Sequence, residues 1–241
     1  MASRLLLVLP LACLAGCFNI GQPEEPPALE PLGTGRGAEP PVGPSSPFQV
    51  RLLEIARTYE SYGRLDSGAR WAPAFCAAPP LPSQAHVSAS TDPTTHGRKL
   101  YSLFAKELPK DDPAPATYVV KGKPNPVGQV VVKEAWVPEE VPDAGRPLEP
   151  VTRVVTVGGQ ERQDSFLPYA REDGHLYHAK EKAGLFIMFK VDPATPGTDG
   201  GWVYGTVTAD GQQVTSAGRV ESCVRCHRAA PHDRLFGPPD R

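Results

Sequence analysis

The sequence has no excess of positive charge. Its 241 residues include 25 Lys and Arg against 27 Asp and Glu, which gives a formal net charge of −2. Proteins that bind nucleic acids or anionic membrane surfaces usually carry a clear basic excess on one face. The composition therefore argues against a nucleic-acid partner and against a polybasic membrane-binding patch.

Three further signals are missing. The chain has no glycine-rich nucleotide-binding loop and no internal repeat, and Met188 is its only methionine after Met1. It also contains a single Cys-x-x-Cys pair, whereas a structural zinc site normally needs two pairs of ligands. These absences disfavour nucleotide binding, a repeat architecture and a zinc module.

The apolar run at the N-terminus, residues 5–15, is too short to cross a bilayer, which takes about 20 residues. It follows Arg4 and leads into Leu14-Ala-Gly-Cys17, so residues 1–16 are predicted to be a signal peptide. Small residues directly before a cysteine resemble a bacterial lipobox, which implies cleavage before Cys17 and lipid on its sulfur. We expect an extracytoplasmic protein, lipid-anchored to a bacterial membrane on its periplasmic side or at the cell surface. A simple cleaved signal peptide with an incidental Cys17 is the alternative.

Proline and glycine are abundant, with 29 and 23 residues respectively. Residues 17–47 hold many of the prolines and almost no aromatic residues, so they cannot bury enough apolar surface to offset the entropy of ordering. We expect a disordered tether there. The folded domain is then residues 48–241.

The folded part is expected to be α+β, with a mainly antiparallel sheet and a few helices. Residues 48–59 have helical spacing of apolar positions, through Val50, Leu53, Ile55, Ala56 and Tyr59. Residues 96–107 fit a helix or a strand. Strands are predicted at 127–136, 151–157, 185–190 and 201–208, the last followed by a turn at 209–211.

The strongest motif is Cys223-Val-Arg-Cys-His227. Two thiols at this spacing can each add across a haem vinyl group, and the next residue then offers its imidazole to the iron as proximal ligand. The motif predicts one haem c, attached through Cys223 and Cys226 and ligated by His227. A zinc site and a thioredoxin-like dithiol fit the surroundings less well. A plain disulfide between the two cysteines remains open.

Other residues have less specific interpretations. We expect Cys76 to be buried and inert, Met188 to pack in the core, and His175 and His178 to lie in an exposed loop. His96, beside Arg98 and Lys99, is a candidate partner of a haem propionate, because propionates need cationic or N–H donors. Arg98, Arg225 and Phe236 are the other haem-pocket candidates.

An ordered set of segments resembles the cytochrome P-460 and cytochrome c′-beta family over roughly residues 88–237. Only the haem motif is specific alone, but the order of the whole set is more specific than any member. The segments are Thr95-His-Gly-Arg-Lys-Leu-Tyr101, Pro126-Val-Gly-Gln-Val-Val-Val-Lys-Glu134, Leu185-Phe-Ile-Met-Phe-Lys190, Gly200-Gly-Trp-Val-Tyr204, Asp210-Gly211, Cys223-Val-Arg-Cys-His227 and Asp233-Arg-Leu-Phe236. The stretch between Val137 and Leu185 departs from the compact family pattern.

The resemblance implies a largely β-sheet domain, often dimeric, with one c-type haem whose five-coordinate iron binds small ligands such as nitric oxide. In the P-460 branch a lysine is joined to the porphyrin and the enzyme oxidises hydroxylamine; Lys133 is the matching residue here. The expected function is a tethered haem protein that binds nitric oxide or a related small ligand, with hydroxylamine oxidation if Lys133 is cross-linked. A six-coordinate electron-transfer cytochrome and a haem-free binding module are the alternatives.

Strand alternation makes the role of Lys133 conditional. Val130, Val132 and Glu134 should face one way, while Val131 and Lys133 face the other. If the Val131 side lines the haem cavity, burial would favour the neutral amine of Lys133, which is the species able to attack an oxidised porphyrin edge. If Lys133 points to solvent, only reversible ligand binding is expected.

Overall fold

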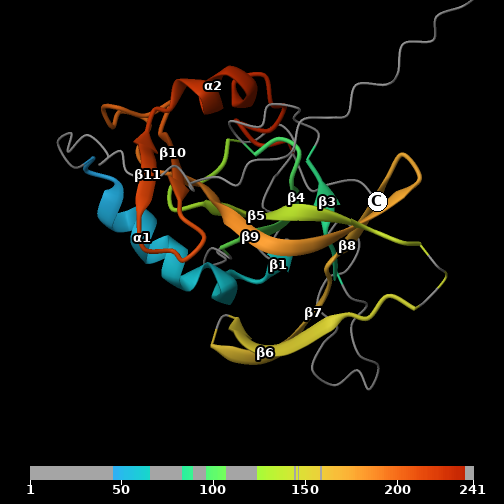
Figure 1. The fold of residues 1–241 in the computed structure, drawn as a ribbon. Coiled ribbons are helices and arrows are strands. Elements are labelled where there is room, and N and C mark those ends of the chain that lie inside the picture. The colour runs from blue at the N-terminus through green and yellow to red at the C-terminus, as the bar shows by residue number, and fades with distance from the viewer. Residues whose placement is uncertain are drawn as a thin grey trace, which may run out of the picture.

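The structure is a computed structural model, which describes residues 46–65, 83–88, 96–106, 124–143, 145, 147–157 and 159–236. The predicted signal peptide, Cys17, nearly all of the tether, and Cys76 lie outside the described residues. The described part is mainly antiparallel β-sheet with two short α-helices, which confirms the expected α+β class (Figure 1).

The larger sheet has eight strands, and every pairing in it is antiparallel. Its main path runs β1 (Arg64–Leu65), β4 (Leu100–Ala105), β5 (Val130–Val141), β9 (His175–Lys190), β10 (Trp202–Val207) and β11 (Val214–Gly218). Two short strands join it at the side: β3 (His86–Val87) pairs with β4, and β8 (Tyr169–Glu172) pairs with β9. The long β5–β9 pair forms the centre of this sheet.

A second, three-stranded sheet lies beside the first. It consists of β2 (Ser83–Gln84), β7 (Gln160–Leu167) and β6 (Val151–Val157), in that order. β6 and β7 are antiparallel, whereas β2 and β7 are parallel. β6, β7 and β8 all lie between Val137 and Leu185 in the sequence, whereas β2 precedes the larger sheet's β3.

Helix α1 (Gln49–Thr58) and the 3₁₀ turn η1 (Tyr59–Tyr62) cover one face of the larger sheet. Leu52, Ile55 and Tyr59 pack there against alternate residues of the strands, such as Val132 and Ile187. The predicted helix is confirmed, but its predicted apolar face is partly wrong: Val50 is 80% exposed and Leu52 is fully buried. Leu52 is accommodated because β10 offers Gly205 opposite it, where a Cβ would lie 2.4 Å from Leu52 Cδ2.

The opposite face of the same sheet carries α2 (Glu221–His227), so the two helices lie on opposite sides (Figure 1). Between this face and α2 lies a separate cluster of buried side chains, which comprises Ala105, Val131, Met188, Trp202, Tyr204, Val224 and Leu235. The alternation predicted for β5 is confirmed, because Val130 and Val132 belong to the α1 side and Val131 to the α2 side.

Several local predictions need correction or completion. The ambiguous stretch 96–107 contains strand β4, since its residues pair on both sides with β1, β3 and β5. His175 and His178 lie in β9 rather than in a loop, because β9 begins directly after the Asp173–Gly174 turn. Both turn residues have positive φ, which suits a two-residue hairpin and explains the tight connection to β8.

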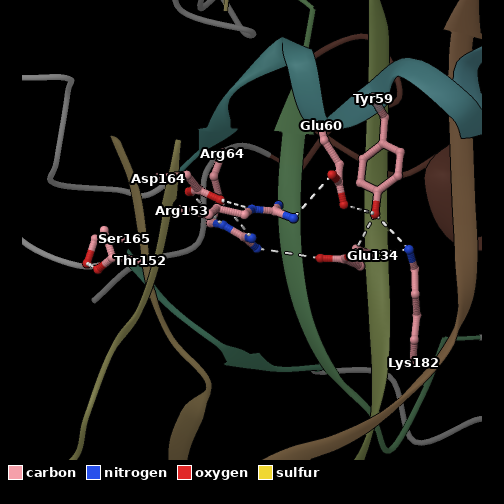
Figure 2. Close-up of polar contacts among 9 residues, drawn as sticks. All are labelled: Tyr59, Glu60, Arg64, Glu134, Thr152, Arg153, Asp164, Ser165 and Lys182. Carbon is pink, nitrogen blue, oxygen red and sulfur yellow. Dashed lines mark hydrogen bonds and ion pairs between the residues drawn. The ribbon is translucent and has the colours of Figure 1, made fainter. Parts of the chain in front are cut away.

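A buried polar network joins the two sheets on the α1 side (Figure 2). Arg64, whose side chain is 5% exposed, lies between the rings of Phe104 and Phe166 and donates to Asp164 of β7 at 3.2 and 3.3 Å. Its other terminal nitrogen is 3.5 Å from Glu134 Oε2 in β5. Glu134 in turn accepts a 2.5 Å hydrogen bond from Tyr59. Charged groups buried this deeply are stable only as mutual partners.

Candidate functional site

A cavity opens on the α2 side of the larger sheet, between β4, β5, β9, β10 and the segment from α2 to residue 236. It holds about 760 Å³ of space free of atoms, which includes the open solvent at its mouth. Its lining is mainly apolar and aromatic. The lining residues are His96, Tyr101, Leu103, Val131, Lys133, Phe186, Ile187, Met188, Tyr204, Gly205, Cys223, His227, Leu235 and Phe236.

Helix α2 presents the Cys-x-x-Cys-His motif to this cavity. Val224, 1% exposed, packs the helix onto the sheet, and the i, i+3 and i, i+4 spacing places Cys223, Cys226 and His227 along one side of it. Cys223 and His227 line the cavity, and Cys226 is exposed. Both cysteines are free thiols, and burial raises the pKa of the Cys223 thiol.

The imidazole of His227 is oriented by the backbone that follows the helix. Its Nδ1 lies 2.7 Å from the carbonyl oxygen of Arg234, so Nδ1 carries the proton and donates it there. This leaves the lone pair of Nε2 for another partner, as in histidines that bind metals. Burial lowers the pKa of His227, which keeps the ring neutral near pH 7.

The turn that supplies this carbonyl is unusual. Asp233 and Arg234 have φ of +49° and +75°, a region that costs residues other than glycine free energy. Side-chain contacts hold the turn: Arg234 donates to both carboxylate oxygens of Asp199 at 2.7 and 3.1 Å. Asp233 accepts hydrogen bonds from Lys190 at 3.0 Å and from the backbone N–H of Asn125 at 2.9 Å.

Beside β4 and β5, the side chains of Lys133, His96 and Ser88 form a polar cluster at the cavity. Lys133 Nζ donates to Ser88 Oγ at 3.1 Å, lies 3.1 Å from His96 Nδ1, and stands over the ring of Tyr101 at 3.8 Å. Ser88 Oγ is also 3.2 Å from His96 Nδ1. No carboxylate lies among the residues that line the described cavity. The polar side of the cavity is therefore basic rather than acidic.

Burial changes the ionisation of this pair. The pKa of Lys133 falls to about 7, first through desolvation and then through repulsion from Lys99. The pKa of His96 falls to about 3, again mainly through desolvation, with further contributions from Lys133 and His227. Near pH 7 the imidazole is neutral, and the lysine exchanges readily between its charged and neutral forms.

The structure brings together most of the residues predicted from sequence. His96, Lys133, Cys223, His227 and Phe236 line one cavity, although Phe236 is 59% exposed; Cys226 is not among the lining residues. Met188, predicted to pack in the core, belongs to a buried cluster and also lines the cavity. Arg98 and Arg225, the other pocket candidates, are exposed and are not among the lining residues. Arg98 has φ +51° in the turn before β4, and Arg225 lies on the outer side of α2.

Four residues of the site were missed by the sequence analysis: Ser88, Tyr101, Tyr204 and Arg234. Alternation places Tyr101 with Leu103 on one face of β4 and Tyr204 with Trp202 on one face of β10, but only the register between strands shows that these faces line the cavity. Ser88 and the carbonyl of Arg234 carry no sequence signal, because their roles depend on contacts across the fold. Tyr204 donates to Asp199 at 3.1 Å, and its ring centre is 5.5 Å from that of His227.

Comparison with known proteins identifies no relative: no family model, curated protein or solved structure matches this chain. The resemblance to the P-460 and c′-beta family therefore remains a prediction. In the described part of the chain, no helix is long and apolar enough to span a membrane. Among the same residues, no three His, Cys, Asp or Glu side chains are arranged to hold a metal ion.

Proposed function

We propose that this chain is an extracytoplasmic c-type haem protein that binds a small ligand, such as nitric oxide, on the iron face opposite His227. The observation that carries the proposal is the geometry of the motif: Cys223 and His227 line one cavity, and His227 directs Nδ1 to the Arg234 carbonyl. If Cys223 and Cys226 formed only a disulfide, nothing in that role would require His227 to donate from Nδ1 and keep Nε2 free. That is the state in which a histidine binds a metal.

The residues present fit such a group. The thiols of Cys223 and Cys226 would each add S–H across a vinyl double bond, which forms two thioethers and requires no oxidant. His227 would supply Nε2, and the apolar walls from Val131, Phe186 and Leu235 would exclude water. When bound, the haem supplies an iron that binds diatomic and nitrogenous ligands or exchanges electrons.

The chemical state of Lys133, linked to the haem or not, distinguishes hydroxylamine oxidation from reversible ligand binding. The Lys133 amine reaches the cavity, and the lowered pKa makes the neutral, nucleophilic form available near pH 7. A covalent link from this amine to the porphyrin edge would replace a C–H bond by a C–N bond, which requires a two-electron oxidant such as a peroxide. The linked form would support hydroxylamine oxidation, by the resemblance to the P-460 branch. Without the link, reversible ligand binding is the activity that remains.

An electron-transfer cytochrome is the second candidate function, and Met188 is the observation that favours it. Met188 lines the cavity and is the one sulfur ligand besides cysteine that the described residues offer. It is 8% exposed and packs with Val131, Trp202 and Leu235, as expected for a core residue. We therefore rank this function below ligand binding.

The first test is covalent haem attachment. The wild-type chain, expressed with its export signal and a haem-attachment system, should retain haem staining after denaturing electrophoresis. The Cys223→Ala/Cys226→Ala variant should lose it completely, because no thioether can form. A Cys76→Ala variant serves as the matched control and should stain like the wild type. Staining retained in the double variant would contradict the proposal.

The second test is the state of Lys133. We expect peptide mapping of the haem-loaded protein to return the Lys133 peptide unmodified and in full yield, because the amine already contacts Ser88 and His96. Intact mass measured on the same sample provides the check. A haem peptide joined to the Lys133 peptide would instead indicate the hydroxylamine-oxidising version.

A further inference from the structure

We propose that His96 is the protein's own ligand for the iron face opposite His227, and that a small ligand binds by displacing it. The inference rests on the proposed haem and concerns what occupies the site when no exogenous ligand is present. It differs from the five-coordinate iron implied by the family resemblance. It follows from the relation between two histidines that are far apart in the sequence.

The first step is the distance between the two rings. The ring centres of His96 and His227 are 6.4 Å apart, with 73° between the ring planes. Two imidazoles that bind one metal from opposite sides have ring centres about 6 Å apart, since each metal–nitrogen bond is about 2 Å and each ring centre lies roughly 1 Å beyond its nitrogen. The fold therefore holds the two histidines at a separation that an iron between them would require.

The second step is the nitrogen that each ring has available. A histidine that binds a metal commonly uses one ring nitrogen and donates a hydrogen bond from the other. His227 uses Nδ1 for the Arg234 carbonyl, and His96 has Ser88 Oγ 3.2 Å from its Nδ1. Lys133 Nζ lies 3.1 Å from the same Nδ1, so the proton of His96 sits on Nδ1 when the Lys133 amine is neutral, a form that its pKa of about 7 makes available. In that state Nδ1 donates to Ser88, and both rings have Nε2 free.

The third step is how firmly His96 is held. Phe186 of β9 packs edge-on against its ring, with 5.4 Å between ring centres. On the other side of the ring, Lys133 and Ser88 both contact Nδ1. His96 also precedes the turn at Gly97 and Arg98 that leads into β4, and Gly97 is buried. A side chain fixed from three directions loses little entropy on binding a metal.

The consequence is a site with two states. With His96 bound, the iron has two imidazole ligands and is low-spin, which suits electron transfer; with His96 displaced, the same face accepts a small ligand. A small ligand must compete with His96 for the iron. Its apparent affinity and association rate therefore equal the intrinsic values multiplied by the fraction of protein in which His96 is not bound.

The experiment compares the spin state of three haem-loaded proteins. Ferric wild-type protein should be low-spin by electron paramagnetic resonance and absorption, and His96→Ala should be high-spin. Imidazole added to His96→Ala should restore the low-spin signal, and cyanide association should be about tenfold faster in this variant than in the wild type. His175→Ala, which removes an exposed histidine of β9 outside the cavity, should remain low-spin.

The outcomes separate this inference from the proposed function. High-spin iron in the wild type, or a low-spin signal that persists in His96→Ala, would overturn the role of His96 while haem staining still supports the haem. Absence of covalent haem in the wild type would overturn both. A His96→Gln variant, whose amide can still contact Ser88, should be high-spin as well, and a low-spin signal there would also refute the assignment.

Discussion

At the scale of single residues, the site depends on a backbone carbonyl as much as on side chains. The carbonyl of Arg234 determines which nitrogen of His227 is free, and it is available only because Asp233 and Arg234 adopt positive φ. Asp199 and Lys190 hold these two residues through their side chains. The strain of the turn is offset by ion pairs whose role is to position His227.

Asp199→Asn tests this positioning. Asp199, 7% exposed, accepts hydrogen bonds from Arg234 and Tyr204, and loss of its charge should lower the free energy of unfolding by about 1–3 kcal/mol at pH 7. Urea denaturation gives this value. An exposed carboxylate, Glu172, provides the control, and Glu172→Gln should change it by less than about 0.5 kcal/mol.

The stability difference between the wild type and Asp199→Asn should depend on pH. The hydrogen bond from Arg234 lowers the pKa of Asp199 below its ordinary value of 3.8. A carboxyl group with a lowered pKa contributes stability above its unfolded pKa and loses it as the pH falls through its folded pKa. The difference between wild type and Asp199→Asn should therefore be constant from pH 7 to about 5 and shrink below about pH 4. A difference that grows on acidification would contradict the ion pair.

At the scale of elements, the network around Arg64 connects strands of the two sheets through side chains. Arg64 follows η1 in β1, Glu134 belongs to β5, and Asp164 belongs to β7 of the smaller sheet (Figure 2). Arg153 of β6 extends the network, with its side chain 3.2 Å from Asp164 and 3.1 Å from Glu60. The smaller sheet is thus attached to the larger one through buried charge, in addition to the apolar contacts of Phe166 with Leu100 and Ala179.

Arg64→Met measures that attachment. Removal of the guanidinium takes two hydrogen bonds from buried Asp164 and one of two cationic neighbours from buried Glu134, which keeps Lys182 at 3.3 Å. We expect a loss of about 3 kcal/mol in the free energy of unfolding. Arg51→Met, which breaks the exposed pair with Glu54, is the control and should cost less than about 1 kcal/mol. Equal effects of the two substitutions on urea denaturation would show that the network contributes no stability.

At the scale of the whole molecule, the larger sheet separates two tasks. Its α1 face is a continuous apolar core with Leu52, Ile55 and Tyr59, and its other face carries the cavity under α2. Adjacent residues of one strand therefore serve different roles: Lys133 enters the cavity, and Glu134 joins the buried network. This division allows polar groups such as Lys133 to enter the cavity without weakening the main core.

The anchor predicted from residues 1–47 also belongs to this scale. Cys17→Ser should release the protein from the membrane fraction or block its maturation, since two or three acyl chains bind a membrane far more firmly than none. Cell fractionation with immunoblotting measures the outcome, and Cys76→Ser is the matched control. A processed Cys17→Ser protein that remains fully membrane-bound would refute the lipobox interpretation.

The sequence alone, through local chemistry and periodicity, was sufficient to predict part of the site and part of the fold. The spacing of Cys223, Cys226 and His227 places three reactive groups on one side of a short helix whatever surrounds it, so the motif could be interpreted without a fold. Alternation likewise predicted the facing of Val130, Val131 and Lys133, because side chains of a strand point to opposite sides by geometry alone. The helix at residues 48–59 and the strand at 151–157 follow from the same periodicities.

The partners across the sheet were decided only by the tertiary structure. His96 lies near Lys133 because β4 and β5 pair with Leu103 opposite Lys133, and a shift of one residue would turn every side chain to the other face. The meeting of His96 with His227 further depends on how α2 packs on the sheet, and the Arg234 carbonyl on a turn held by Asp199. Such contacts join residues distant in the sequence, and no local pattern encodes the register or the packing that brings them together.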